Sequence, residues 1–218
     1  MSTLKILIAD DYDIVRIGLR VLLEKQPEWT ICAEAVNGRE AVEKAIDTQP
    51  DVVLMDFSMP ELNGLDATRQ IRKACPQAEV LILTMHDSEQ LVRELLEAGA
   101  RGYLVKTDVS QNLVPAVLSL AEHKPYFASN VSSLLLDSFL RPGGPQPGDR
   151  NTGSRLSPRE REIVQLVAEG KSSKEVATTL NIALKTVNAH RANIMNKLDL
   201  RSLGELVLYA VRNKLVQP

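Results

Sequence analysis

The sequence predicts a doubly wound α/β domain with a five-stranded parallel sheet, followed by a separate all-α domain of four helices. Three observations support this prediction. Strand-like and helix-like segments alternate over residues 4–122, a stretch rich in proline and glycine fills 141–154, and only helical patterns follow it. Alternating strands and helices form a parallel sheet with helices on both faces, because their crossover connections are right-handed. The strand order expected for such a sheet is 2-1-3-4-5.

Short apolar runs mark the strands of the first domain. The runs at 52–55 and 80–83 are continuously apolar, which is typical of strands buried on both faces. Apolar residues at helical spacing mark the helices. In the second helix the residues expected to point inward are Ala41, Val42, Ala45 and Ile46. The expected strands are 4–9, 30–35, 52–55, 80–83 and 102–105, and the expected helices are 14–23, 38–48, 63–75, 88–98 and 112–122.

Pro115 falls where the fifth helix should already have begun. A proline in a helix interior costs about 3 kcal/mol, whereas the first turn tolerates it. We therefore expect this helix to start late, with Asn112 as its N-cap.

The segment after this helix predicts a connection between domains. Residues 128–140 carry Val131, Leu134, Leu135 and Phe139 and predict a further apolar helix. Three prolines and four glycines in 141–154 exclude a regular element, so this stretch is a linker. The predicted limits are 1–124 for the first domain, 125–154 for the linker helix and linker, and 155–218 for the second domain.

Helix-capping signals define the second domain. The segments 157–160 and 172–175 are both capping boxes, and Pro158 stands at the first helical position. Gly170 is expected to end the first of these helices. The third and fourth helices are expected at 184–198 and 203–213.

Charge is distributed unevenly between the two halves. Residues 1–140 hold 13 Lys and Arg against 21 Asp and Glu, whereas 155–218 hold 11 against 6. The basic half suggests that only the second domain meets a polyanion, although ordinary scatter along a chain also fits. No apolar run is long enough to span a membrane, and the start of the chain lacks a signal-peptide layout, so we expect a cytoplasmic protein. Cys32 and Cys75 are expected to be buried thiols.

Polar side chains follow the carboxyl ends of the predicted strands. In a doubly wound sheet these ends meet at one edge, and ligands bind where the strand order reverses. The residues at these ends are Asp10, Asp11, Asp56, Thr84 and Lys106. Clustered carboxylates repel one another unless a cation joins them. Carboxylates also suit Mg²⁺, a hard divalent cation that takes oxygen ligands.

This set of side chains fits phosphoryl chemistry. The Asp56 carboxylate can attack a phosphoryl donor as a nucleophile. Mg²⁺ and Lys106 would neutralise the charge on the transferred group. Thr84 could donate a hydrogen bond to a phosphate oxygen, and the new charge would then move the loop that carries Thr84.

Residues 1–122 resemble the receiver domains of two-component response regulators. The residues that carry the resemblance are Asp10-Asp11, Asp56, Met59-Pro60, Asn63-Gly64, Thr84, Tyr103 and Lys106. The resemblance implies a flavodoxin-like fold, Mg²⁺ as cofactor, and Asp56 as the residue that accepts a phosphoryl group from a histidine kinase.

The resemblance also implies further residue roles. The implied Mg²⁺ ligands are Asp10, Asp11, Asp56 and the backbone carbonyl of Ser58. Tyr103 would be an aromatic switch that turns inward when Thr84 moves, although from the residues alone a half-buried strand aromatic is the plainer interpretation. Ser58 and His86 flank the site at positions where family members tune the lifetime of the phosphoryl group.

The predicted helix 184–198 has two distinct faces. Its apolar face is formed by Val187, Ile194 and Leu198, and its opposite face by Lys185, Asn188, Ala189 and Ala192. The second face is small, polar and basic, which suits the major groove of DNA. Asn188 could pair with adenine, whereas Lys185, Thr186 and Arg191 are better placed to bind phosphates. A solvated face of a small helical bundle would show the same periodicity.

Residues 155–218 resemble the four-helix LuxR-type helix-turn-helix domain of NarL/FixJ-type regulators. The matching residues are Leu156–Glu160, Glu169-Gly170, Lys174–Ala177, Lys185–Val187, His190-Arg191 and Lys197-Leu198. The resemblance implies binding to double-stranded DNA and pairing of two copies through the fourth helix. Ala183 departs from the pattern, because such domains usually place an N-capping serine there.

We therefore expect a phosphorylation-dependent transcription regulator with a partner histidine kinase, DNA as its target and a homodimer as its active form. One alternative is a DNA-binding regulator that phosphorylation does not control. A second is a phosphatase for small substrates, which would leave the basic helical half unexplained. We do not expect an enzyme.

Overall fold

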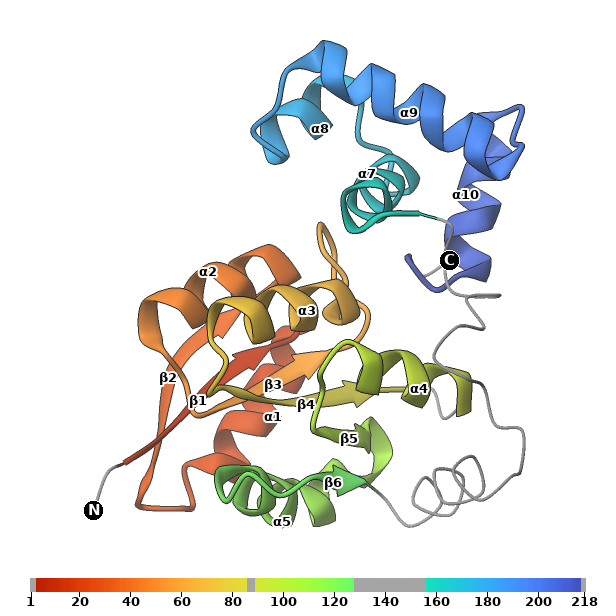
Figure 1. Cartoon of the computed structure of the whole chain (residues 1–218). Coiled ribbons are helices and arrows are strands. Elements are labelled where there is room, and N and C mark those ends of the chain that lie inside the picture. The colour runs from red at the N-terminus through yellow and green to blue at the C-terminus, as the bar shows by residue number, and fades with distance from the viewer. Residues whose placement is uncertain (1–2, 86–88, 128–155, 217–218) are drawn as a thin grey trace. The chain divides into compact units, whose positions relative to one another are not determined.

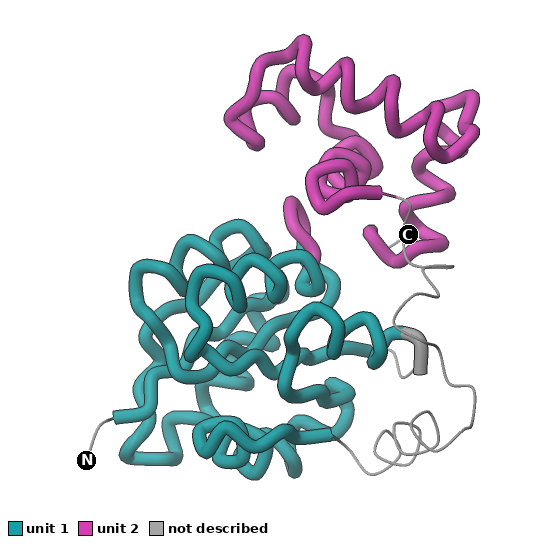
Figure 2. The backbone as a smooth tube through the Cα atoms, in the orientation of Figure 1, with its two compact units in different colours: residues 1–59, 64–144 teal, residues 60–63, 145–218 magenta. Residues whose placement is uncertain are grey.

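The structure is a computed structural model that describes residues 3–85, 89–127 and 156–216. The chain forms two compact units, residues 1–59 with 64–144 and residues 60–63 with 145–218 (Figure 2). The predicted helix at 128–140 and the predicted linker at 141–154 lie outside the described residues. In the described ranges, no helix combines the length and apolar character needed to cross a membrane.

The first unit is built on a parallel sheet, as predicted (Figure 1). Within the described residues the strands follow the order β2-β1-β3-β4-β5-β6, which contains the predicted order and adds a sixth strand. The strands are β1 (Leu4–Ala9), β2 (Trp29–Ala35), β3 (Val52–Asp56), β4 (Glu79–Thr84), β5 (Gly102–Val105) and β6 (Tyr126–Phe127).

Helices cover both faces of this sheet. In Figure 1, α2 and α3 lie on one face, and α1 and α5 lie on the other. The helices are α1 (Asp13–Leu23), α2 (Gly38–Thr48), α3 (Gly64–Ala74), α4 (Glu89–Glu97), a short 3-10 helix η1 (Lys106–Asp108) and α5 (Val109–Ala121). Apolar side chains of β1, β3, β4 and β5 pack with those of α1 and α5 into one core. This core holds the carboxyl ends of the strands in fixed register.

The sixth strand is short and lies past the predicted limit of 124. Tyr126 aligns with Gly102 and Phe127 with Tyr103, so β6 extends the sheet beyond β5. The Tyr126 hydroxyl also donates to Asn112 Oδ1 at 3.1 Å, which ties the strand to α5. Two residues give no periodic signal, since a strand needs four or more residues to show alternation.

The predicted late start of the fifth helix is wrong. This helix begins at Val109, directly after η1, and Pro115 lies inside it on an exposed position. Pro115 has no N–H to donate to the carbonyl of Gln111, a loss of about 3 kcal/mol. The inward residues of the helix are almost fully buried, and they are Leu113, Ala116, Val117 and Leu120. Burial of one leucine side chain contributes about 2 kcal/mol, so packing outweighs the proline.

Two burial predictions also need correction. Ala41 and Ala45 of α2 are buried as predicted, but Ile46 is 47% exposed because it lies at the margin of the inward face. Cys75 is buried, whereas Cys32 in the edge strand β2 is only half-buried. Both cysteines are free thiols.

The second unit consists of helices in its described residues, as predicted. They are α7 (Pro158–Ala168), α8 (Ser173–Thr179), α9 (Leu184–Leu198) and α10 (Leu203–Arg212). Both predicted capping boxes are present, at Ser157 and Ser172. Gly170 follows α7 with a φ of +88°, a left-handed conformation that glycine adopts without strain. The core includes Ile163, Leu166, Val187, Ile194 and Leu206.

The N-cap of α9 generates a stability prediction. Ala183 occupies this position and makes no side-chain capping hydrogen bond, whereas serines cap α7 and α8. Ala183→Ser should supply the missing acceptor and stabilise the second unit by about 1 kcal/mol. Urea denaturation followed by circular dichroism would measure this gain, and Ser172→Ala should show a loss of similar size. An unchanged or earlier transition in Ala183→Ser would contradict the prediction.

Candidate functional site

The carboxylates predicted at the strand ends come together in the structure. β1 and β3 are neighbours at the point where the strand order reverses. Asp10 directly follows β1, and Asp56 is the last residue of β3. Carboxylate oxygens of Asp10, Asp11 and Asp56 lie within 4.8 Å of one another. The sheet edge therefore concentrates three acidic groups in a small, largely buried volume.

Lys106 bridges two of these carboxylates. Its ammonium nitrogen lies 2.7 Å from Asp10 Oδ2 and 2.9 Å from Asp56 Oδ1. Lys106 is the first residue of η1, directly after β5, so the sheet also positions this cation. Its side chain is only 14% exposed. The ion pairs are therefore screened less than pairs on the surface.

Burial and crowding change the protonation of these groups. Burial raises the pKa of Asp56 to about 6, even though Lys106 works in the opposite direction. Burial also raises the pKa of Asp11, aided by Asp10 and opposed by Lys106 and Arg16. Burial alone would lower the pKa of Lys106, but Asp56 and Asp10 outweigh it and raise this pKa. Removal from solvent, more than repulsion among the carboxylates, therefore disfavours the ionised forms of Asp56 and Asp11.

The site meets the requirements of a hard divalent cation. Asp11 Oδ1 is buried and has no hydrogen-bond partner among the described residues. An orphaned buried oxygen beside two further carboxylates offers the oxygen ligands that Mg²⁺ prefers. A cation there would also relieve the repulsion among the three groups.

The other predicted receiver residues lie close to this edge of the sheet. Thr84 is the last residue of β4 and is buried, next in register to the Asp56–Leu83 pair. Tyr103 lies in β5 and is completely buried, so it is not a half-buried strand aromatic. Ser58 is partly exposed in the loop after β3. His86 lies outside the described residues.

The structure shows why residue 64 is a glycine, which the sequence motif alone did not explain. A Cβ atom at this position would lie 2.1 Å from the backbone oxygen of Asp56. The Gly64 N–H also donates to the carbonyl of Phe57 at 2.8 Å. Only glycine therefore lets α3 begin so close to the end of β3.

The exposed face of α9 agrees with the sequence prediction. Its outward residues are all exposed, and they are Lys185, Asn188, Ala189 and Ala192. Val187 and Ile194 on the opposite side are almost fully buried. Thr186 and Arg191 are half-buried, and Arg191 donates to Ser173 Oγ at 2.7 Å. This bond ties α9 to α8 and keeps the exposed face in a fixed orientation within its unit.

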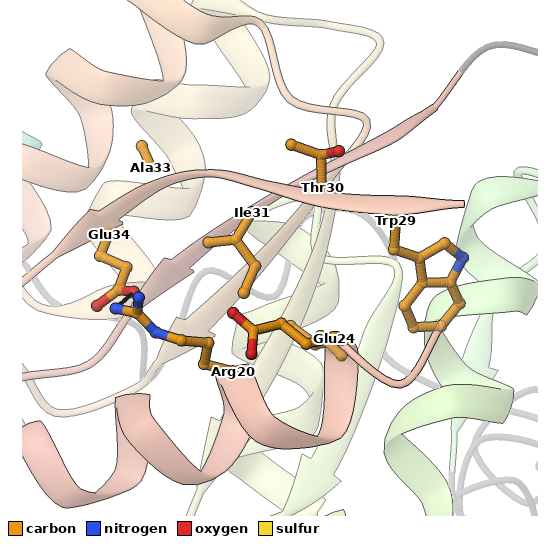
Figure 3. A pocket seen from close by; sticks show the side chains of 8 residues that line it. Arg20, Glu24, Trp29, Thr30, Ile31, Ala33 and Glu34 are labelled. Carbon is orange, nitrogen blue, oxygen red and sulfur yellow. Dashed lines mark hydrogen bonds and ion pairs between the residues drawn. The ribbon is translucent and has the colours of Figure 1, made fainter. Parts of the chain in front are cut away.

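A separate hollow of about 520 Å³ lies between α1 and the edge strand β2 (Figure 3). Its apolar lining includes Trp29 and Ile31. Arg20 and Glu34, two of its charged groups, form an ion pair with each other. No residue of the carboxylate cluster lines this hollow, so we do not place the chemistry there.

Comparisons with known proteins agree with this two-part arrangement. Residues 6–118 match the family described as "Response regulator receiver domain". Residues 154–210 match the family described as "Bacterial regulatory proteins, luxR family".

The relatives match over nearly the whole chain. The oxygen regulatory protein NreC of Staphylococcus carnosus (strain TM300) is 39% identical over 98% of this chain and 99% of its own length. A LuxR-family response regulator from Aurantimonas sp. SI85-9A1 has a TM-score of 0.60 and 34% identity over 64% of this chain and 100% of its own. The response regulator RcsB of Salmonella typhimurium has a TM-score of 0.58 and 26% identity over 97% of this chain and 100% of its own. The chain therefore belongs to the response regulators that join a receiver domain to a DNA-binding domain of the luxR family.

Proposed function

We propose that this regulator binds DNA under the control of a phosphoryl group on Asp56, which a partner histidine kinase supplies in the cytoplasm. The observation that carries the proposal is the cluster of Asp10, Asp11, Asp56 and Lys106 at the switch point of the sheet. We place the receiver domain at 1–124, extended to Phe127 because β6 pairs with β5, and the DNA-binding domain at 155–218.

Phosphoryl transfer needs a nucleophile and positive charge around it. A carboxylate oxygen of Asp56 attacks the phosphorus, the bond between phosphorus and the histidine nitrogen breaks, and that nitrogen takes up a proton from water. Lys106 already pairs with Asp56, so its ammonium can also pair with the phosphoryl oxygens once the group is transferred. Asp10, Asp11, Asp56 and the backbone carbonyl of Ser58 would hold Mg²⁺, which neutralises negative charge on the transferring group.

The new group changes the electrostatics at the edge of the sheet. A phosphoryl group adds about −1.5 to −2 of charge at neutral pH. The Thr84 hydroxyl, at the end of β4, can donate to one of its oxygens. Tyr103, on the neighbouring strand β5, would be the aromatic switch that faces inward when Thr84 moves, and its ring is already fully buried in this structure. The switch therefore depends on side chains that the two strands hold in register.

The α9 helix presents the DNA-reading surface in this proposal. Lys185, Thr186 and Arg191 would bind phosphates, and Asn188, Ala189 and Ala192 would face base edges. A solved complex of the relative RcsB with DNA, 25% identical over 97% of this chain, supports DNA as the target. Another structure contains two RcsB dimers on two parallel DNAs, which supports a homodimer.

The proposal predicts that a phosphodonor tightens DNA binding through Asp56. Fragments selected from the host genome would serve as the DNA, and binding would be measured with and without acetyl phosphate and Mg²⁺. Wild-type protein should bind more tightly with the donor, whereas Asp56→Asn should not respond. Equal binding by both proteins in both conditions would favour a regulator that phosphorylation does not control. Absence of specific binding throughout would overturn the proposed DNA target.

The carboxylate cluster predicts an unusual pH dependence of stability. Asp56 has a pKa of about 6 in the folded chain, above the 3.9 of an unperturbed aspartate, so the folded state binds its proton more tightly. Stability should therefore fall as pH rises from about 4 to 6, by about 3 kcal/mol. Asp56→Asn removes this cost, so it should be more stable than wild type at pH 7.5 in EDTA.

Denaturation followed by fluorescence of Trp29, the single tryptophan, would report this difference for the first unit. The advantage of Asp56→Asn should shrink toward pH 4, where both side chains are neutral. Added Mg²⁺ should narrow it at pH 7.5 by stabilising the wild type. A variant less stable than wild type at pH 7.5 would contradict the prediction.

The DNA-binding face predicts two distinct mutant phenotypes. Lys185→Ala should weaken binding to all sequences and reduce the slope of log affinity against log salt by about 1, because one phosphate contact is lost. Asn188→Ala should instead reduce discrimination between the selected DNA and a scrambled one by about 1–3 kcal/mol. Fluorescence anisotropy at several salt concentrations would separate the two. The assignment fails if Asn188→Ala changes only the salt slope.

A further inference from the structure

Both the backbone and the side chain of Asp10 are fixed by hydrogen bonds and an ion pair. Its backbone N–H donates to the carbonyl of Ala35 at 3.1 Å. Its carboxylate accepts the Tyr12 N–H at 3.0 Å and pairs with the Lys106 ammonium. Its backbone carbonyl accepts a hydrogen bond from Arg16 Nη1 at 2.8 Å. Of these contacts, only the one from Arg16 fixes the carbonyl through which the chain continues to Asp11.

Arg16 is itself firmly positioned. It lies on α1, and its side chain is only 11% exposed. A second nitrogen of its guanidinium pairs with Asp13 in the first turn of α1. A third, Nε, lies 3.4 Å from Glu34 Oε2 in β2. One planar guanidinium thus joins the end of β1, the start of α1 and the edge strand β2. A lysine ammonium at this position could not make all three contacts at once.

We infer that Arg16 is a positioning residue for the phosphoryl site, which sets the direction in which Asp10 and Asp11 present their carboxylates to a divalent cation. It acts through the backbone carbonyl of Asp10 and does not touch the cation. Such outer partners orient the ligands of a metal site, and their loss typically lowers metal affinity by about 10–100-fold. The inference rests on the proposed function, because it assumes a cation at this cluster.

Arg20 provides a matched control on the same helix. It lies one turn after Arg16 and pairs with Glu34 (Figure 3), whose carboxylate Arg16 also contacts. Its side chain is 47% exposed, and within the described residues its hydrogen bond and ion pair go to Glu34 and not to Asp10 or Asp11. Arg20→Gln therefore removes an arginine from the α1–β2 surface and leaves the Asp10 carbonyl with its partner.

The test is the affinity of the full chain for Mn²⁺, followed by the loss of the free Mn²⁺ signal in electron paramagnetic resonance, with Mg²⁺ as competitor. Arg16→Gln should bind Mn²⁺ about tenfold more weakly than wild type. Arg20→Gln should stay within about twofold of wild type, because the site itself is untouched. Arg16→Lys should fall between these variants, since it keeps the charge but not the planar group. Thermal melts in EDTA would show that each variant is folded.

The outcomes separate the inference from the proposed function. If wild type and Arg16→Gln bind Mn²⁺ equally, Arg16 does not position the site, and the inference is overturned while the proposed function stands. Equal weakening by Arg16→Gln and Arg20→Gln would also overturn it, because the effect would then belong to the α1–β2 surface. Absence of Mn²⁺ binding by wild type would overturn both. If Arg16→Gln does not fold, the comparison of Arg16→Lys with Arg20→Lys decides the same question.

Discussion

The mutual repulsion of three carboxylates at one edge of a parallel sheet is the constraint on which the rest of this site depends. The fold forces Asp10, Asp11 and Asp56 together because their strands are neighbours whose carboxyl ends meet. Lys106 offsets part of this charge, yet burial still raises the pKa of Asp56 to about 6. Three carboxylates face a single ammonium, so the cluster carries a net negative charge when all of these groups are ionised. In the proposed function, a divalent cation held by these carboxylates would favour the ionised form of Asp56, the form that attacks phosphorus.

The clustering of the candidate site residues could be predicted from the sequence, because the signals for it are local. These residues lie at or within two positions of the end of a strand that an apolar run in the sequence predicts. The topology of a doubly wound sheet brings such ends together. The supporting contacts could not be predicted in this way. Arg16 acts on a backbone carbonyl, and no sequence pattern indicates which of the arginines on a helix faces one. The role of Gly64 likewise depends on a distance of 2.1 Å between parts of the chain that only the folded structure joins.

The errors in the predicted elements have a common physical origin. Pro115 disfavours a helix locally, but the burial of the inward face of α5 outweighs this preference. β6 is too short to show any periodicity, and its pairing with β5 alone defines it as a strand. Ile46 has the right spacing for the inward face of α2 but lies at its margin. In each case contacts between segments that are distant in the sequence decide the outcome, and local sequence patterns do not reveal those contacts.

The same packing limits how a signal could leave the proposed phosphoryl site. β3 and β4 are buried along their whole length and are paired on both sides, so neither strand can shift without breaking a ladder of hydrogen bonds. The addition of β6 gives β5 a neighbour on its outer side as well, at the register of Tyr103. The backbone of Tyr103 is therefore held between two strands. In the proposed mechanism, a charge added at Asp56 would therefore act first on side chains, namely the Lys106 ammonium and the Thr84 hydroxyl. On this proposal the response would pass through side chains and loops at one edge of the sheet, while the paired strands keep their register.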